Sequence, residues 1–179
     1  VHVIVITGAG EKFFCAGATI GMLKDADPDF KYYFCLHANE TLNRLEQTPK
    51  LVIAALNGHT VGGGFEVAMA ADIRIACKEA GKIGLPEVAL GVLPGTGGTQ
   101  RLARLVGKAR AIELMIHGRL LSMEEAAAMG LVSEVWGAEQ LNGRPFLDAV
   151  IDYARQFTPP NKASRAVLLW RRSSESFRS

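Results

Sequence analysis

Two glutamates and a run of glycines are the residues whose types and spacing could carry out a reaction. Gly62, Gly63 and Gly64 follow an apolar stretch and lead into Glu66, at the start of a predicted helix. The first backbone N–H groups of a helix have no partner inside it, and glycines let a ligand oxygen approach them closely. This pattern predicts a site for an oxyanion; the alternative is that the glycines only let a strand pack tightly on a helix.

Glu66 and Glu87 are candidates for a pair that shares a proton. Glu87 stands beside Pro86 among apolar residues, so we expect a partly buried acid there. The helix macrodipole alone would also explain a carboxylate at Glu66. If the two carboxylates lay about 5 Å apart, their repulsion would be about 3 kcal/mol at an effective dielectric constant of about 20. They would then titrate as a coupled pair with one proton between them near neutral pH.

Nucleotide and metal chemistry have less support. Gly8 and Gly10 begin a dinucleotide-binding pattern, but Phe13 stands where the third glycine is required. The glycine-rich stretch 95–100 lacks the lysine of a phosphate-binding loop. The four histidines show no metal-ligand spacing, so we predict no metal site. We expect His59, beside the glycines, to be a hydrogen-bonded loop residue rather than a catalyst.

The composition limits the class of partner. The chain has 179 residues, with 20 Lys and Arg against 18 Asp and Glu, so no basic surplus indicates a nucleic acid or an anionic membrane. A hydrophobic content of 49% fits one globular domain. The apolar stretch 51–71 is long enough to span a bilayer, but its Asn57, His59, Glu66 and four glycines argue against this. Three widely spaced cysteines favour a reducing compartment over a disulfide framework.

Buried strands and helices alternate along the chain and would position these residues. Apolar runs predict strands at residues 1–7, 51–56, 72–76 and 131–135. Helical spacing predicts helices at 31–47, 65–71 and 147–154, and a helical region at 102–116 that Gly107 divides. A capping box from Ser122 to Glu125 begins another helix, which Gly130 ends. This order predicts an α/β layered fold.

Three glycine clusters, at 8–21, 58–64 and 91–98, end apolar runs and could converge on one ligand.

Three stretches of the chain, taken together and in order, are similar to one enzyme family. They are 14–20 (FCAGATI), 57–72 (NGHTVGGGFEVAMAAD) and 84–102 (GLPEVALGVLPGTGGTQRL). They resemble the enoyl-CoA hydratase/isomerase family, the crotonase superfamily, and most of all an enoyl-CoA hydratase. The resemblance implies a crotonase-like spiral of ββα units, with C-terminal helices that build trimers, commonly paired into hexamers.

The resemblance also implies roles for particular residues. Ala18 and Gly63 match the positions of the two backbone N–H donors that bind the thioester oxygen, and Glu66 and Glu87 match the two catalytic carboxylates. By family analogy, Glu66 mainly activates water and Glu87 mainly protonates the substrate Cα. The residues implied in substrate binding are Ala16, Ala18, Thr19, Ile20, Gly62 and Gly63. Thr19 stands where an aspartate is common in hydratases, so we expect a local effect on acyl-chain preference.

The reaction implied is the addition of water to trans-2-enoyl-CoA, which gives 3-hydroxyacyl-CoA. No metal or redox cofactor is implied, because coenzyme A is part of the substrate. Three alternatives remain open: another acyl-CoA isomerase, decarboxylase or lyase of the superfamily, a non-catalytic acyl-CoA-binding subunit, and a nucleotide-binding oxidoreductase. We expect a homotrimer or a hexamer, and a cytoplasmic location or, in a eukaryote, the mitochondrial matrix.

The match to the family also predicts how the chain is divided. We expect residues 1–157 to form the crotonase-like core, with the N-terminal part of the family domain absent from the chain. Residues 158–179 are expected to form a truncated or divergent C-terminal helical segment.

Overall fold

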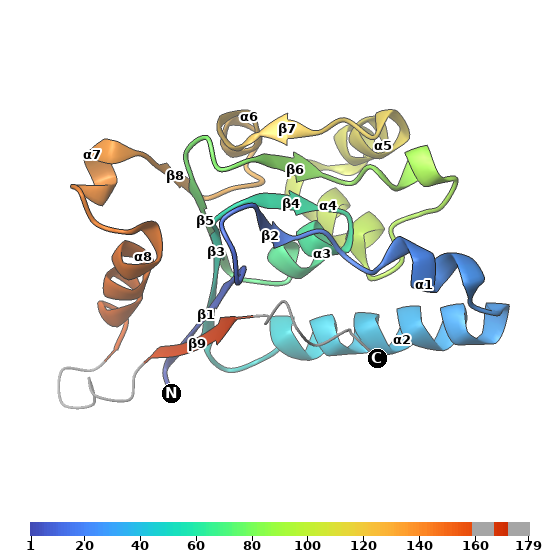
Figure 1. Cartoon of the computed structure of the whole chain (residues 1–179), viewed down its shortest axis with the longest axis horizontal. Coiled ribbons are helices and arrows are strands. Elements are labelled where there is room, and N and C mark those ends of the chain that lie inside the picture. Colours follow the sequence, from blue (N-terminus) through green and yellow to red (C-terminus); the bar gives the residue numbers. More distant parts are fainter. Residues whose placement is uncertain (159–166, 172–179) are drawn as a thin grey trace.

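Two β-sheets with helices around them make up the computed structural model, which describes residues 1–158 and 167–171 (Figure 1). The larger sheet is parallel and runs, from edge to edge, through β8 (Glu134–Trp136), β5 (Ile73–Cys77), β3 (Leu51–Leu56), β1 (Val3–Thr7) and β9 (Val167–Arg171). The smaller sheet runs through β2 (Phe13–Cys15), β4 (His59–Val61), β6 (Lys82–Gly84) and β7 (Leu121–Ser122), of which β7 alone is antiparallel to its neighbour.

The chain alternates between the two sheets, which produces repeated ββα units. Each of β1, β3 and β5 in the larger sheet is followed by a strand of the smaller sheet and then by helix. These helices are α1 (Ile20–Asp25) and α2 (Pro28–Glu46) in the first unit, α3 (Gly63–Met69) in the second, and η1 (Glu87–Leu90), α4 (Gly98–Val106) and α5 (Lys108–His117) in the third. The expected α/β fold is therefore confirmed. The segment before α1 and the start of η1 both lie close to the start of α3.

The remaining helices are α6 (Met123–Ala128), α7 (Ala138–Leu141) and α8 (Phe146–Arg155). The last covers one face of the larger sheet, and the first packs against β6, β7 and β8. None of the helices described is long and apolar enough to cross a membrane.

The central strands β1 and β3 are apolar on both faces because each face covers a separate core. Successive strand residues point to opposite sides. Val3 and Val5 pack in one core with Val150 of α8, while Ile6 packs in the other with Phe65 of α3. This double burial explains the continuous apolar runs that predicted these strands.

Local capping signals are confirmed by the helix boundaries. The Ser122 hydroxyl accepts a hydrogen bond from the Glu125 N–H at 3.1 Å, and the Glu125 carboxylate accepts one from the Ser122 N–H at 2.8 Å. Gly107, with φ of +80°, separates α4 from α5 as predicted. These contacts involve neighbours along the chain, which is why sequence spacing predicts them.

Two predicted elements differ in the structure. The strand expected at 131–135 is β8, which begins only at Glu134, because the Leu131 N–H donates to the Ala126 carbonyl and closes α6. The helix expected in the C-terminal segment is wrong for residues 167–171, which form β9 in register with β1. This pairing gives hydrogen-bond partners to the edge of β1. The rest of that segment, 159–166 and 172–179, lies outside the described residues.

Candidate active site

Glu66 lies in the first turn of α3, at the point where β4 leads into that helix. Gly62, which precedes α3, has φ of +56°, a left-handed conformation that glycine adopts without strain. The sharp turn directs the first residues of α3 into the protein, and Glu66 is only 2% exposed. A carboxyl group so placed needs hydrogen-bond partners from the protein.

The Glu66 carboxyl group receives three hydrogen bonds from one loop, between η1 and α4. The Thr96 and Gly98 N–H groups donate to Oε1 at 2.9 Å and 2.7 Å. The Thr96 hydroxyl donates to Oε2. Three donors suit an ionised carboxylate, because this form can only accept hydrogen bonds.

The chain after β2 lies against the N-terminus of α3. A Cβ added at Gly64 would meet the Cys15 carbonyl oxygen at 1.9 Å, so only glycine fits this approach. Ala18 is thereby brought to Gly63, where an added Cβ would lie 3.9 Å from the Ala18 nitrogen. No described residue accepts a hydrogen bond from the N–H of Ala18 or Gly63. Both groups are available to a ligand oxygen.

Glu87 begins η1 and approaches the same glycines from the other side. A Cβ added at Gly62 would lie 3.3 Å from Glu87 Oε1. Glu87 Oε2 is buried, with no hydrogen-bond partner among the residues described. Burial raises the pKa of Glu87 above that of an ordinary carboxyl group; a backbone hydrogen bond opposes the increase, and the charge of Glu66 adds to it. The two glutamates thus differ in surroundings: one is hydrogen-bonded and the other is poorly solvated.

We expect the variant Glu87→Gln to become more stable relative to the parent protein as the pH rises. Because the pKa of Glu87 is raised on folding, its contribution to stability is complete below the ordinary carboxyl pKa and is lost as the pH rises through the raised value. Glutamine does not titrate, so the variant avoids this loss. Thermal unfolding of both proteins from about pH 4 to about pH 8 measures the effect. A difference in Tm that stays constant over this range would contradict it.

The structure places the remaining predicted substrate residues on the segment that carries Ala18. The Ala16 carbonyl oxygen lies 3.9 Å from a Cβ added at Gly62. Thr19 precedes α1 and makes no capping hydrogen bond with its side chain, and Ile20 is 60% exposed at the start of that helix. Thr19 and Ile20 are therefore exposed residues, in contrast to the buried Glu66. His59 is hydrogen-bonded as expected, since its Nδ1 accepts a hydrogen bond from the Lys82 N–H at 3.1 Å, but it begins strand β4 rather than lying in a loop.

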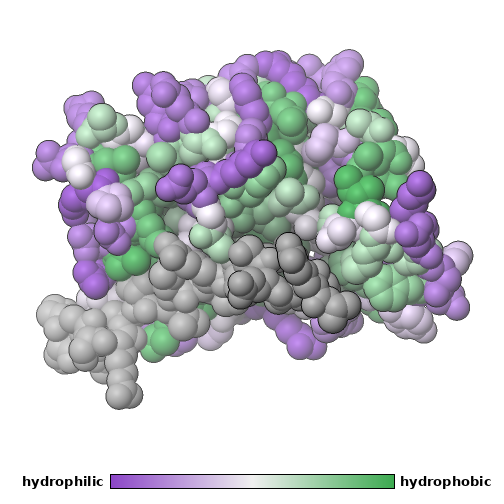
Figure 2. Space-filling view, viewed as in Figure 1, coloured by the Kyte–Doolittle hydropathy of each residue, from purple (hydrophilic) through white to green (hydrophobic). Residues whose placement is uncertain are grey.

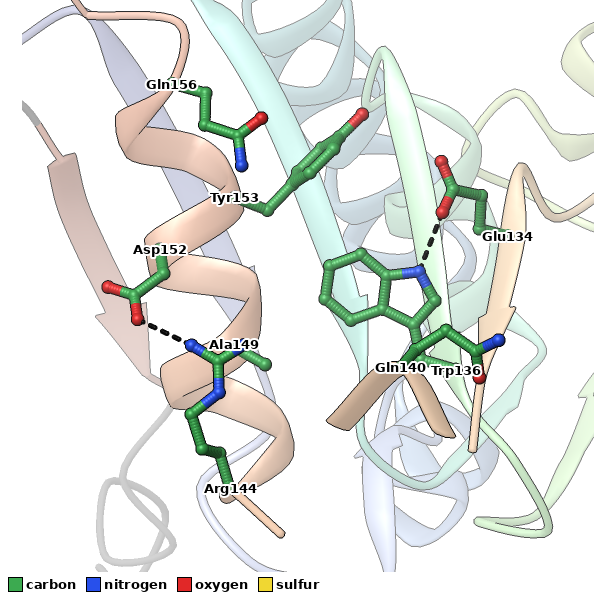
Figure 3. Close-up of a pocket in the computed structure, with 8 residues that line it drawn as sticks. All are labelled: Glu134, Trp136, Gln140, Arg144, Ala149, Asp152, Tyr153 and Gln156. Carbon is green, nitrogen blue, oxygen red and sulfur yellow. Dashed lines mark hydrogen bonds and ion pairs between the residues drawn. The ribbon is translucent and has the colours of Figure 1, made fainter. Parts of the chain in front are cut away.

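A pocket elsewhere in the molecule lies among β8, α7 and α8 (Figure 3). Figure 3 shows the Trp136 indole donating to Glu134 and Arg144 paired with Asp152. None of the predicted site residues lines it; the lining residues are Glu134, Trp136, Gln140, Arg144, Ala149, Asp152, Tyr153 and Gln156. Its Trp136 and Ala149 belong to the core on the α8 side of the larger sheet, whereas Glu66 lies on the α3 side. The pocket is separate from the candidate active site.

Comparison with known proteins identifies the family. The family model for enoyl-CoA hydratase/isomerase matches residues 1–165. The chain belongs to this family. The resemblance stated from the three sequence stretches, and the crotonase-like fold that it implied, are thereby confirmed.

Members of the enoyl-CoA hydratase/isomerase family from several organisms are similar to the chain. The short-chain-enoyl-CoA hydratase of Clostridium acetobutylicum is 47% identical over 132 residues, which are 74% of this chain and 50% of that protein. The crotonyl-CoA hydratase of Syntrophomonas wolfei is 43% identical over 141 residues, 79% of this chain and 54% of that protein. The crystal structure of enoyl-CoA hydratase from Bacillus anthracis superposes with a TM-score of 0.79 at 40% identity, over 87% of this chain and 58% of that one. The chain spans about half the length of these curated relatives.

Two residues of the site, Thr96 and Arg101, were not predicted from the sequence. Thr96 supplies two of the three hydrogen bonds to Glu66. Arg101 is 4% exposed and donates to the Thr96 carbonyl oxygen at 3.0 Å. Both lie inside the stretch 84–102 that carried the family resemblance, so the signal was present. Nothing in the spacing indicated that a threonine of this stretch would face a glutamate 30 residues earlier.

Proposed function

We propose that the protein hydrates trans-2-enoyl-CoA thioesters to 3-hydroxyacyl-CoA. The observation that carries this proposal is the convergence of Glu66 and Glu87 on the adjacent glycines Gly62 and Gly63, beside the available N–H of Ala18. A buried and a half-buried carboxyl group next to available backbone donors would supply the acid, the base and the oxyanion site that this reaction needs.

The backbone donors would stabilise the charge that develops on the thioester oxygen. Water adds to the β-carbon of an unsaturated thioester only if the electrons of the double bond move toward that oxygen, which gives enolate character. The N–H groups of Ala18 and Gly63 would donate to this oxygen, and the second stands at the positive end of α3. Loss of one such donor typically costs about 3 to 4 kcal/mol of barrier.

The two glutamates would divide the proton transfers. Glu66, with its three donated hydrogen bonds, is suited to remain a carboxylate and take a proton from the attacking water. Glu87, whose pKa burial raises, is suited to hold a proton and deliver it to the α-carbon. One C–O bond and one C–H bond form, while the π bond of the substrate and one O–H bond of water break. The proton that Glu66 takes from water balances the one that Glu87 gives to carbon, and its return to Glu87 restores the starting state.

We also infer that coenzyme A enters as part of the substrate and that the chemistry uses only carboxyl groups and backbone amides of the protein. A homotrimer or hexamer, in the cytoplasm or the mitochondrial matrix, is part of the same proposal. Figure 2 shows apolar residues at the surface of this face of the molecule. Four exposed apolar residues follow Glu87 closely in the sequence: Val88, Leu90, Val92 and Leu93. Exposed apolar groups of this kind support contact with an acyl chain or a further subunit.

Turnover of crotonyl-CoA by the purified protein tests the function. We expect the ultraviolet absorbance of the enoyl thioester to disappear and labelled oxygen from solvent water to enter the product. Glu87→Gln should lower kcat by roughly 10²-fold or more, because the proton donor is lost. Unchanged activity in this variant would remove Glu87 from the mechanism. A rearranged or cleaved product without solvent oxygen would instead indicate an isomerase, a decarboxylase or a lyase, and binding without turnover a non-catalytic subunit.

A further inference from the structure

The two oxygens of Glu66 are held in different ways. Oε1 accepts two backbone N–H groups, from Thr96 and Gly98, which do not depend on the Thr96 side chain. Oε2 accepts the Thr96 hydroxyl, which depends on the side chain at this position. Rotation about the terminal torsion of the side chain, which is intrinsically soft, moves both oxygens together. The hydroxyl on Oε2 and the N–H groups on Oε1 therefore restrain the same carboxylate plane from two sides.

Oε2 is the oxygen that faces the reaction site. A Cβ added at Gly63 would lie 3.8 Å from Oε2 and 3.9 Å from the Ala18 nitrogen. The water that attacks the substrate must therefore meet Oε2 rather than Oε1, which the loop encloses. A carboxylate oxygen has two lone pairs, so one hydroxyl donor leaves the other lone pair for that water.

The loop that carries Thr96 is itself braced. Arg101 is buried and donates to the Thr96 carbonyl oxygen at 3.0 Å. Its other nitrogens bind Asn43 at 2.7 Å and Glu46 at 3.0 Å, both on α2. Thr96 cannot move away from Glu66 without breaking its hydrogen bond from the buried Arg101, which Asn43 and Glu46 hold in place.

We propose that Thr96 is a positioning residue, whose hydroxyl orients Glu66 Oε2 toward the attacking water. This inference rests on the proposed hydration. It assigns to one side chain the direct contact with the basic oxygen, which the backbone donors restrain only through Oε1. Threonine and serine can fill the role; valine, of the same shape without the hydroxyl, cannot.

Kinetics of three variants test the inference. Thr96→Val should lower kcat for crotonyl-CoA by about 10- to 100-fold, because a misplaced reacting group costs rate, while KM stays within about two-fold. Thr96→Ser should keep most of the activity, since it retains the hydroxyl. Thr99→Val is the matched control, three residues later in the first turn of α4, because the Thr99 hydroxyl has no hydrogen-bond partner among the described residues; its kcat should match the parent. Equal kcat values for Thr96→Val and the parent would overturn the proposal, as would a fall that serine fails to restore.

A second measurement does not depend on activity. We compare the decrease in Tm that Thr96→Val causes in the parent protein with the decrease it causes in the Glu66→Gln variant. The decrease should be about 2 to 4 °C larger in the parent, because a hydrogen bond to a charged acceptor is stronger than one to a neutral acceptor. Equal shifts in the two backgrounds would overturn the pairing of Thr96 with Glu66. If the parent fails to hydrate crotonyl-CoA, the proposed function falls and this comparison alone decides the pairing. If Thr96→Val does not fold, Thr96→Ala takes its place in both measurements.

Discussion

Replacing Glu66 by glutamine is expected to lower kcat for the hydration of crotonyl-CoA by roughly 10²- to 10⁴-fold, the usual contribution of a general base. Glutamine keeps an oxygen that can accept the Thr96 and Gly98 N–H groups, so the loop and α3 should stay in place. What the variant loses is the ability to take a proton from water. Steady-state kinetics with crotonyl-CoA, together with a thermal unfolding curve, measures both effects.

The matched control is Glu40→Gln, an exposed carboxylate on α2, which should leave kcat within about two-fold of the parent. The double variant Glu66→Gln, Glu87→Gln should lose little more than either single variant, because residues that act as a unit are not additive. A kcat for Glu66→Gln equal to that of the parent would exclude Glu66 as the base. Losses of the two single variants that multiply fully in the double variant would argue against a shared proton transfer.

Gly64→Ala is expected to destabilise the protein by about 3 kcal/mol, since the new methyl group has no room and must displace backbone. The Cβ would meet the Cys15 carbonyl oxygen at 1.9 Å and its carbonyl carbon at 2.4 Å. Neither atom can move without separating β2 from α3. The packing of β2 on α3 is also what brings Ala18 close to Gly63. A loss of this size lowers Tm by about 6 to 12 °C in a domain of this length.

Gly10→Ala separates this packing effect from the general cost of replacing glycine. A Cβ added at Gly10 meets nothing within 4 Å, so its Tm should lie within about 2 °C of the parent. If Gly64→Ala unfolds at the same temperature as Gly10→Ala, the close approach of α3 to the Cys15 carbonyl is wrong. Any activity that Gly64→Ala retains should also be reduced, because the two backbone donors would separate.

Local signals made parts of the fold predictable from sequence. The capping box at Ser122 and the division at Gly107 both appear in the structure, because their contacts span only a few residues. The apolar strands were also recognisable, since burial on two faces leaves a continuous run of apolar side chains. The end of the chain was misjudged for 167–171, because parallel pairing with β1 is a contact between opposite ends of the sequence.

The amino-acid order alone determined the chemistry available to this protein: two acids in apolar surroundings, and glycines where a helix begins. Tertiary structure decided which atoms of these residues face one another. Glu66 takes its donors from a loop 30 residues later, and the Ala18 nitrogen reaches Gly63 only through the packing of β2 on α3. The physical reason is that spacing along a chain reports contacts within one element, whereas the meeting of helix starts depends on the crossover of each ββα unit between two sheets.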